Sequence, residues 1–85
     1  IFIMKTQEYL RNEFYKVVKG ANWMTPKLLE FYPIKNGVVE LSTGPKFCDS
    51  TPFGVTVVKN NVHDTDLGRC LWSLDEALNY IKSLQ

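Results

Sequence analysis

The segment "CLWSLDEALNYIKSLQ", residues 70–85, decides the fold. Ser73 followed by Glu76 three positions later forms a capping box, which predicts that a helix begins there. Asp75 and Glu76 in the first turn suit the positive end of the helix dipole. The apolar residues of this helix fall on one stripe: Leu74, Ala77, Leu78, Ile81 and Leu84. Because such a stripe must be buried, we expect it to pack on one face of an antiparallel sheet.

A hairpin is predicted upstream, within residues 28–43. Asn36-Gly37 is the strongest hairpin signal in the chain, because a type I′ turn needs positive φ at both central residues. With that turn, Ile34 pairs with Val39. The register places four apolar side chains on one face: Tyr32, Ile34, Val39 and Leu41. A slip by one residue would scramble this face, so the pattern supports the hairpin.

Further strands are predicted at residues 53–60, where Val55 and Val57 alternate with other residues, and at residues 69–72 after a polar loop at 61–68. Pro33 has no amide hydrogen, so the strand that contains it is expected at the sheet edge or with an irregularity. The C-terminal helix is expected to cover one side of the sheet: Tyr32, Ile34, Val39, Leu41, Val55 and Val57.

An N-terminal helix is predicted over residues 6–19, with Gly20 as its C-terminal cap. Its apolar face consists of Leu10, Phe14, Val17 and Val18. Residues 14–19 are aromatic and β-branched, so a strand there is the alternative. Thr25-Pro26 is either an extended connector or the start of a short helix. The predicted fold is therefore α+β: an N-terminal helix, a four-stranded antiparallel meander (three to five strands), and a C-terminal helix on one sheet face.

At 85 residues the chain is expected to form one domain, 1–85, with residues 1–3 as an extension before a natural start at Met4. The formal net charge is +1, which argues against the strongly basic field of proteins whose binding is dominated by phosphate contacts. Cys48 and Cys70 form no CxxC pair, so we expect reduced thiols with Cys70 buried in a strand, and a structural disulfide as the less favoured alternative. A cytoplasmic setting without membrane association follows from these expectations.

One loop offers groups for metal or acid–base chemistry. His63, Asp64 and Asp66 could hold a divalent cation, although Asp is also a common loop residue because its side chain bonds nearby amides. With a single histidine, a nucleophilic triad would need His63 to meet Cys48 or Cys70. We therefore expect no enzyme activity and no cofactor, and rank a small metal enzyme centred on His63 last.

Aromatic and basic residues suggest binding instead. Trp23, Met24, Phe47 and Phe53 lie in or beside loops, and they form either a partner-binding patch or a plug over the open end of the core. Protein binding, to a second copy or to another protein, through the sheet surface that the helices leave open is the favoured function. The chain is therefore read as a small interaction or regulatory module.

Nucleic-acid binding is the alternative, using Lys16, Lys19 and Trp23. The order helix, strands, helix resembles the double-stranded RNA-binding domain, whose second helix opens with lysines that bind phosphate. Here Asp75 and Glu76 stand at the corresponding place, so no functional residue carries over from that resemblance.

Overall fold

The computed structural model describes residues 6–18, 29–44 and 48–85. The elements follow in the order α1 (Gln7–Val17), β1 (Leu29–Ile34), β2 (Gly37–Thr43), β3 (Phe53–Lys59), β4 (Val62–His63), β5 (Arg69–Leu71) and α2 (Leu74–Leu84). The antiparallel sheet has the order β1-β2-β3-β4, and β5 pairs with the other end of β3. The predicted α+β class is confirmed. Over the described residues the sheet has five strands, because β4 forms at the start of the segment predicted as a loop.

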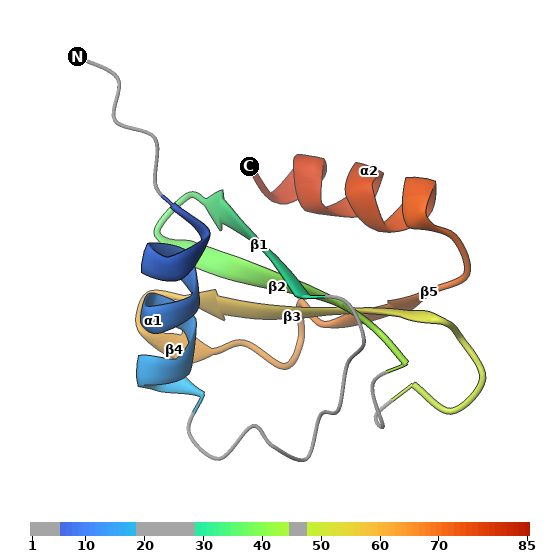
Figure 1. Ribbon diagram of the computed structural model, residues 1–85, viewed down its shortest axis with the longest axis horizontal. Helices are drawn as coiled ribbons and strands as arrows, with labels where there is room; N and C mark the ends of the chain where they lie inside the picture. Colours follow the sequence, from blue (N-terminus) through green and yellow to red (C-terminus); the bar gives the residue numbers. More distant parts are fainter. Residues whose placement is uncertain (1–5, 19–28, 45–47) are drawn as a thin grey trace.

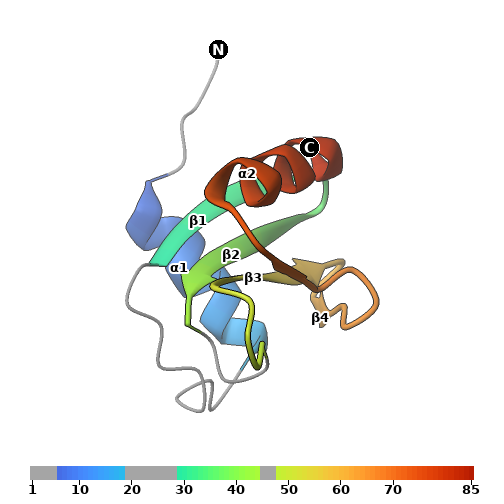
Figure 2. The ribbon, with the colours of Figure 1, turned by 90° about the vertical axis from the view of Figure 1, so that its right-hand side faces the viewer.

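The two helices lie on opposite faces of the sheet (Figures 1 and 2). Under α2 lies a core cluster that contains Ile34, Val39, Leu41, Val55, Val57, Ala77 and Ile81, with Tyr32 packed against it. This is the predicted covered face. Under α1 lies a second cluster: Leu10, Phe14, Val18, Phe31, Val38 and Val58. Each face of the sheet therefore carries a helix.

Helix α1 forms because its cap and its apolar spacing agree. Thr6 is the N-cap, and its side chain accepts a hydrogen bond from the Tyr9 amide. Leu10 and Phe14 are fully buried, one turn apart. The helix continues through Val17, so the strand alternative is wrong for residues 14–17. The Gly20 cap and the Thr25-Pro26 prediction fall outside the described residues.

Helix α2 begins as predicted, because the Ser73 hydroxyl accepts a hydrogen bond of 3.1 Å from the Glu76 amide. Only part of the predicted stripe is buried. Ala77 and Ile81 are buried and Leu84 is half-buried, whereas Leu74 and Leu78 are exposed.

The β1–β2 turn lies one residue earlier than predicted, which shifts the strand pairing by two residues. Ile34 pairs with Gly37 and Tyr32 with Val39, so the turn residues are Lys35 and Asn36. Asn36 alone takes positive φ, 64°, whereas a type I′ turn would need two such residues. A shift of two residues preserves side-chain alternation, which is why the predicted face is correct although the register is not.

Gly37 is needed for a reason other than turn conformation. A Cβ atom at this position would clash with the carbonyl oxygen of Val58 and lie 2.9 Å from the Lys59 Cα. The glycine therefore lets β2 approach the end of β3. The two-residue turn with two left-handed residues occurs instead at Asn60 and Asn61, between β3 and β4.

Cys48 and Cys70 form a disulfide, so the expectation of two reduced thiols is wrong. Their Cα atoms are 5.7 Å apart, because β5 pairs with the beginning of β3 and so brings the two cysteines together. Cys70 is exposed rather than buried. Among the residues that the structure describes, no helix has the length and apolar character needed to cross a membrane.

Candidate functional site

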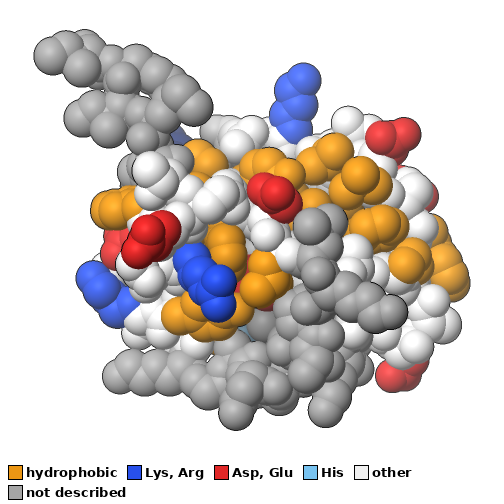
Figure 3. Space-filling view, viewed as in Figure 1, with side chains coloured by type: hydrophobic (Ala, Val, Ile, Leu, Met, Phe, Trp, Pro, Cys, Tyr) orange, Lys and Arg blue, Asp and Glu red, His pale blue; other side chains and the backbone are white. Residues whose placement is uncertain are grey.

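An exposed apolar surface runs from the end of β5 along one flank of α2. It consists of Trp72, which is 64% exposed, Leu74 at 42% and Leu78 at 36%, and we call it the α2 flank. Apolar side chains form a band over α2 in the space-filling view (Figure 3). Three large apolar side chains exposed within seven residues are more than the single scattered exposures that are normal on a protein surface.

The exposure follows from how α2 sits on the sheet. Ala77 and Ile81 turn toward the core, and the small Ala77 is completely buried. Leu74 and Leu78 stand one turn apart on the neighbouring side of the helix, beyond the contact with the strands. The apolar stripe of α2 is therefore wider than the surface that the sheet covers.

Three contacts fix the rotation of α2. The Tyr80 hydroxyl donates to the Leu67 carbonyl, and the Arg69 guanidinium lies over the Tyr80 ring at 5.2 Å. After the last turn, the Gln85 side-chain amide donates to the Pro33 carbonyl at 2.9 Å. These contacts hold the C-terminal half of the helix and the Ser73 hydroxyl caps its first turn, so the flank is exposed by the fold and not by a loosely placed helix.

A polar strip is buried on the opposite face of the sheet. Glu40, Ser42 and Thr56 alternate with core residues on β2 and β3, and they are almost completely buried. The Tyr15 hydroxyl donates to Glu40 Oε2 at 2.7 Å, whereas Glu40 Oε1 and Ser42 Oγ have no hydrogen-bond partner among the residues that the structure describes. Burial without full pairing is costly, so this strip is a source of instability in the core.

The electrostatics of this pair follow from burial. Desolvation raises the pKa of Glu40, and the Tyr15 hydrogen bond and the nearby Arg11 charge oppose that rise. For Tyr15, burial and then the hydrogen bond to Glu40 raise the pKa to about 12. Tyr15 therefore stays protonated at neutral pH and serves as the hydrogen-bond donor to the carboxyl group.

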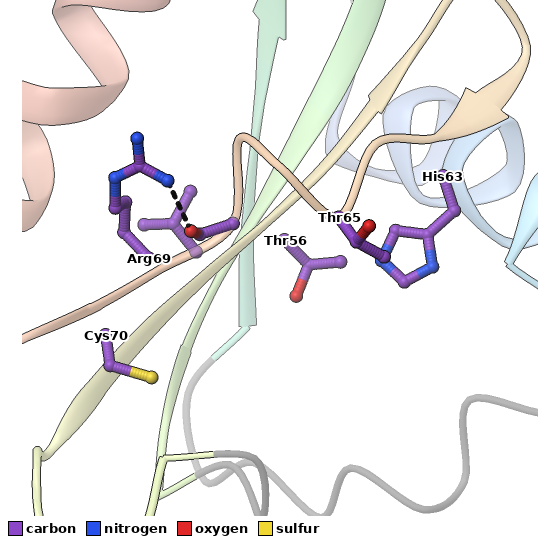
Figure 4. Close-up of a pocket in the computed structure, with 7 residues that line it drawn as sticks. Thr56, His63, Thr65, Arg69 and Cys70 are labelled. Atoms are coloured by element: carbon purple, nitrogen blue, oxygen red, sulfur yellow. Dashed lines mark hydrogen bonds between the residues drawn. The ribbon is translucent and has the colours of Figure 1, made fainter.

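Beside this strip lies a cavity of about 280 Å³. It forms where the partner strand of β3 is interrupted between β4 and β5, and Thr56, His63 and Thr65 point toward one another there (Figure 4). The described lining supplies one imidazole and two hydroxyl groups but no carboxylate. The Arg69 guanidinium donates to the carbonyl oxygens of Asp66 and Gly68, so it is already engaged.

The loop predicted to bind a metal ion uses one of its carboxylates for internal hydrogen bonds. Asp64 Oδ1 accepts hydrogen bonds from the amides of Asp66 and Leu67, so this carboxylate stabilises the conformation of its own loop. His63 lies at the end of β4 and lines the cavity. Over the described parts of the chain, no three His, Cys, Asp or Glu side chains are grouped so that they could hold a metal ion.

The aromatic and basic candidates are only partly placed. Phe53 is half-buried and packs against the core cluster under α2, whereas Trp23, Met24 and Phe47 fall outside the described residues. Lys16 is exposed and pairs with Glu13 at 3.3 Å on the same helix. Lys19, its predicted neighbour in a nucleic-acid site, also falls outside the described residues.

The α2 flank was missed by reasoning from sequence. The sequence analysis predicted that Leu74 and Leu78 belong to the buried stripe of the helix and that Trp72 belongs to the strand at residues 69–72. The sequence offered no signal for this exposure, because five apolar positions over about three turns are the ordinary content of one buried helix stripe. Comparison with models of protein families, with curated proteins and with solved structures finds no match for this chain.

Proposed function

We propose that this chain is a non-catalytic interaction module that self-associates through the α2 flank. The observation that supports this most directly is that Trp72, Leu74 and Leu78 remain exposed beside a well-anchored helix. Removing such side chains from water is favourable, by about 25 cal/mol for each Å² of apolar surface buried. Tryptophan is also the residue type most enriched at the energetic centres of protein interfaces.

A second copy of the chain is the occupant that the charge pattern favours. Leu78 lies midway between Asp75 in the first turn of α2 and Lys82 in its last turn. If two α2 helices pair antiparallel about Leu78, Lys82 of each copy faces Asp75 of the other. The apolar centre is then flanked by opposite charges, and the helix dipoles are also opposed.

The disulfide is relevant to the cellular compartment in which such a module works. Disulfides persist in oxidising compartments and are rare in the reducing cytosol, and the cytoplasmic prediction depended on free thiols. We infer an oxidising compartment. Alkylation of free thiols before cell lysis, followed by mass spectrometry, tests this, and a fully alkylated protein would contradict it.

Sedimentation equilibrium from micromolar to millimolar concentration tests self-association. We expect the average mass to rise from that of one chain toward that of two. Leu78→Lys should weaken association at least about tenfold, because it replaces a central apolar contact with a charge. Val62→Lys is the matched control, since Val62 is 60% exposed on β4 and lies outside the flank. A monomer at every concentration would overturn the proposal.

Charge reversal tests the antiparallel arrangement. Lys82→Glu should weaken the dimer, because it places two acidic side chains opposite each other at both ends. The double variant Asp75→Lys/Lys82→Glu should restore association. If the double variant associates no better than Lys82→Glu alone, the helices do not pair in this way.

A further inference from the structure

The outer edge of β1 is covered by two glutamine side chains, one at each end of the described chain. Gln7, the first residue of α1, donates from Nε2 to the Phe31 carbonyl at 2.7 Å and accepts at Oε1 from the Phe31 amide at 2.8 Å. Gln85 donates from Nε2 to the Pro33 carbonyl at 2.9 Å. The Gln7 side chain thus bonds to β1 as the backbone of a neighbouring strand would.

These bonds define the polar groups of the edge. Because the Phe31 amide and carbonyl point away from β2, alternation along the strand directs those of Leu29 and Pro33 outward as well. Pro33 has no amide hydrogen, as expected of an edge residue. The edge therefore presents two groups each from Leu29 and Phe31 and one from Pro33. The two glutamines bond to three of these five groups.

Without the glutamines, the hydrogen-bonding groups on the β1 edges of two copies would be complementary to each other. Two β1 strands can pair antiparallel about Phe31, so that each Phe31 amide bonds the carbonyl of the other copy. In that register the Leu29 amide of each copy faces the Pro33 carbonyl of the other. Exposed strand edges pair readily with one another, and proteins block them with side chains or covering elements.

We propose that Gln7 and Gln85 form an edge guard that prevents β1 from pairing with β1 of a second copy. The guard depends on both helices, because Gln7 is held in the first turn of α1 by the Thr6 cap and Gln85 follows the last turn of α2. Loosening of either helix end exposes part of the edge. Strand pairing is then a second mode of self-association, separate from the α2 flank.

Hydrogen exchange of the Phe31 amide, followed by NMR, measures the guard directly. In the unaltered protein this amide should exchange slowly although it lies on an edge strand. In Gln7→Ala at low concentration it should exchange roughly tenfold faster, the factor expected for the loss of about one net hydrogen bond. Asn12→Ala removes an exposed amide side chain from the same helix and is the control, with no change expected.

Sedimentation of Gln7→Ala/Gln85→Ala in a Leu78→Lys background tests the strand pairing, because that background weakens association through the α2 flank. We expect a concentration-dependent dimer in which the Phe31 amide is protected again. A monomer with an unguarded, rapidly exchanging Phe31 amide would overturn pairing through β1. Rapid exchange of this amide in the unaltered protein would overturn the guard itself, whether or not the variants fold.

Discussion

Two serines show how the surroundings of one side chain decide its effect on stability. Ser42 Oγ is buried and has no hydrogen-bond partner within the described part of the chain, whereas Ser73 Oγ caps α2. Ser42→Ala should raise the free energy of unfolding by about 1 kcal/mol, because it removes an unpaired polar atom from the core. Ser73→Ala should lower it by about 1 kcal/mol, because the cap is lost. Urea unfolding at pH 7 measures both, and equal losses would mean that Ser42 has a partner.

Glu40 makes stability depend on pH in the direction opposite to that of a carboxylate in an ion pair. Because burial raises its pKa above the usual 4.5, the folded protein binds the proton more tightly than the unfolded chain does. The contribution of Glu40 is therefore most favourable at low pH. It declines as the pH rises from 4.5 through the raised folded-state value.

Glu40→Gln should remove this dependence, because an amide keeps an acceptor for Tyr15 and carries no charge. We expect the variant to gain stability over the unaltered protein as the pH rises from 4 to 7, measured by urea unfolding at each pH. Glu30→Gln on the neighbouring strand is the control. If the difference in free energy of unfolding between Glu40→Gln and the unaltered protein stays constant across this range, the buried Glu40 carboxyl group does not titrate between pH 4 and 7.

At the scale of elements, sequence periodicity predicted faces better than registers. Alternation along β1 and β2 was correct because it depends only on the period of two. The turn was displaced because Gly37 serves a contact with Val58 on β3, and a local pattern carries no sign of that contact. Local turn chemistry allowed either Asn36-Gly37 or Lys35-Asn36, and packing against β3 decided between them.

The same limit applies to α2. Capping and periodicity correctly predicted where the helix begins and that Ala77 and Ile81 face the core. How much of the remaining stripe is covered depends on the width of the sheet beneath it. The candidate interaction surface is the part of α2 that the sheet does not reach, so no pattern within the helix could have separated Leu78 from Ile81.

At the scale of the whole molecule, the disulfide was missed because its two ends meet only through the topology. Cys48 precedes β3 and Cys70 lies in β5, and the spacing of 22 residues carries no signal by itself. Once β5 is known to pair with the beginning of β3, Cys70 lies opposite Gly54, and the segment that precedes β3 can bring Cys48 within reach of it. Predicting this pairing from sequence would require knowing that β4 and β5 both pair with β3, each with a different end of it.

The Cys48–Cys70 disulfide should contribute a large share of the stability of so small a chain. Closing a loop of this length is worth about 3 kcal/mol, and a single core of this size supplies only about 3–5 kcal/mol. Cys48→Ala/Cys70→Ala should therefore lower the free energy of unfolding by about 3 kcal/mol in urea titrations. β5 should loosen first, because it has three residues and only one strand partner, so its amides should lose protection from hydrogen exchange before those of β2. Uniform loss across the sheet would mean instead that the bridge constrains only the unfolded chain.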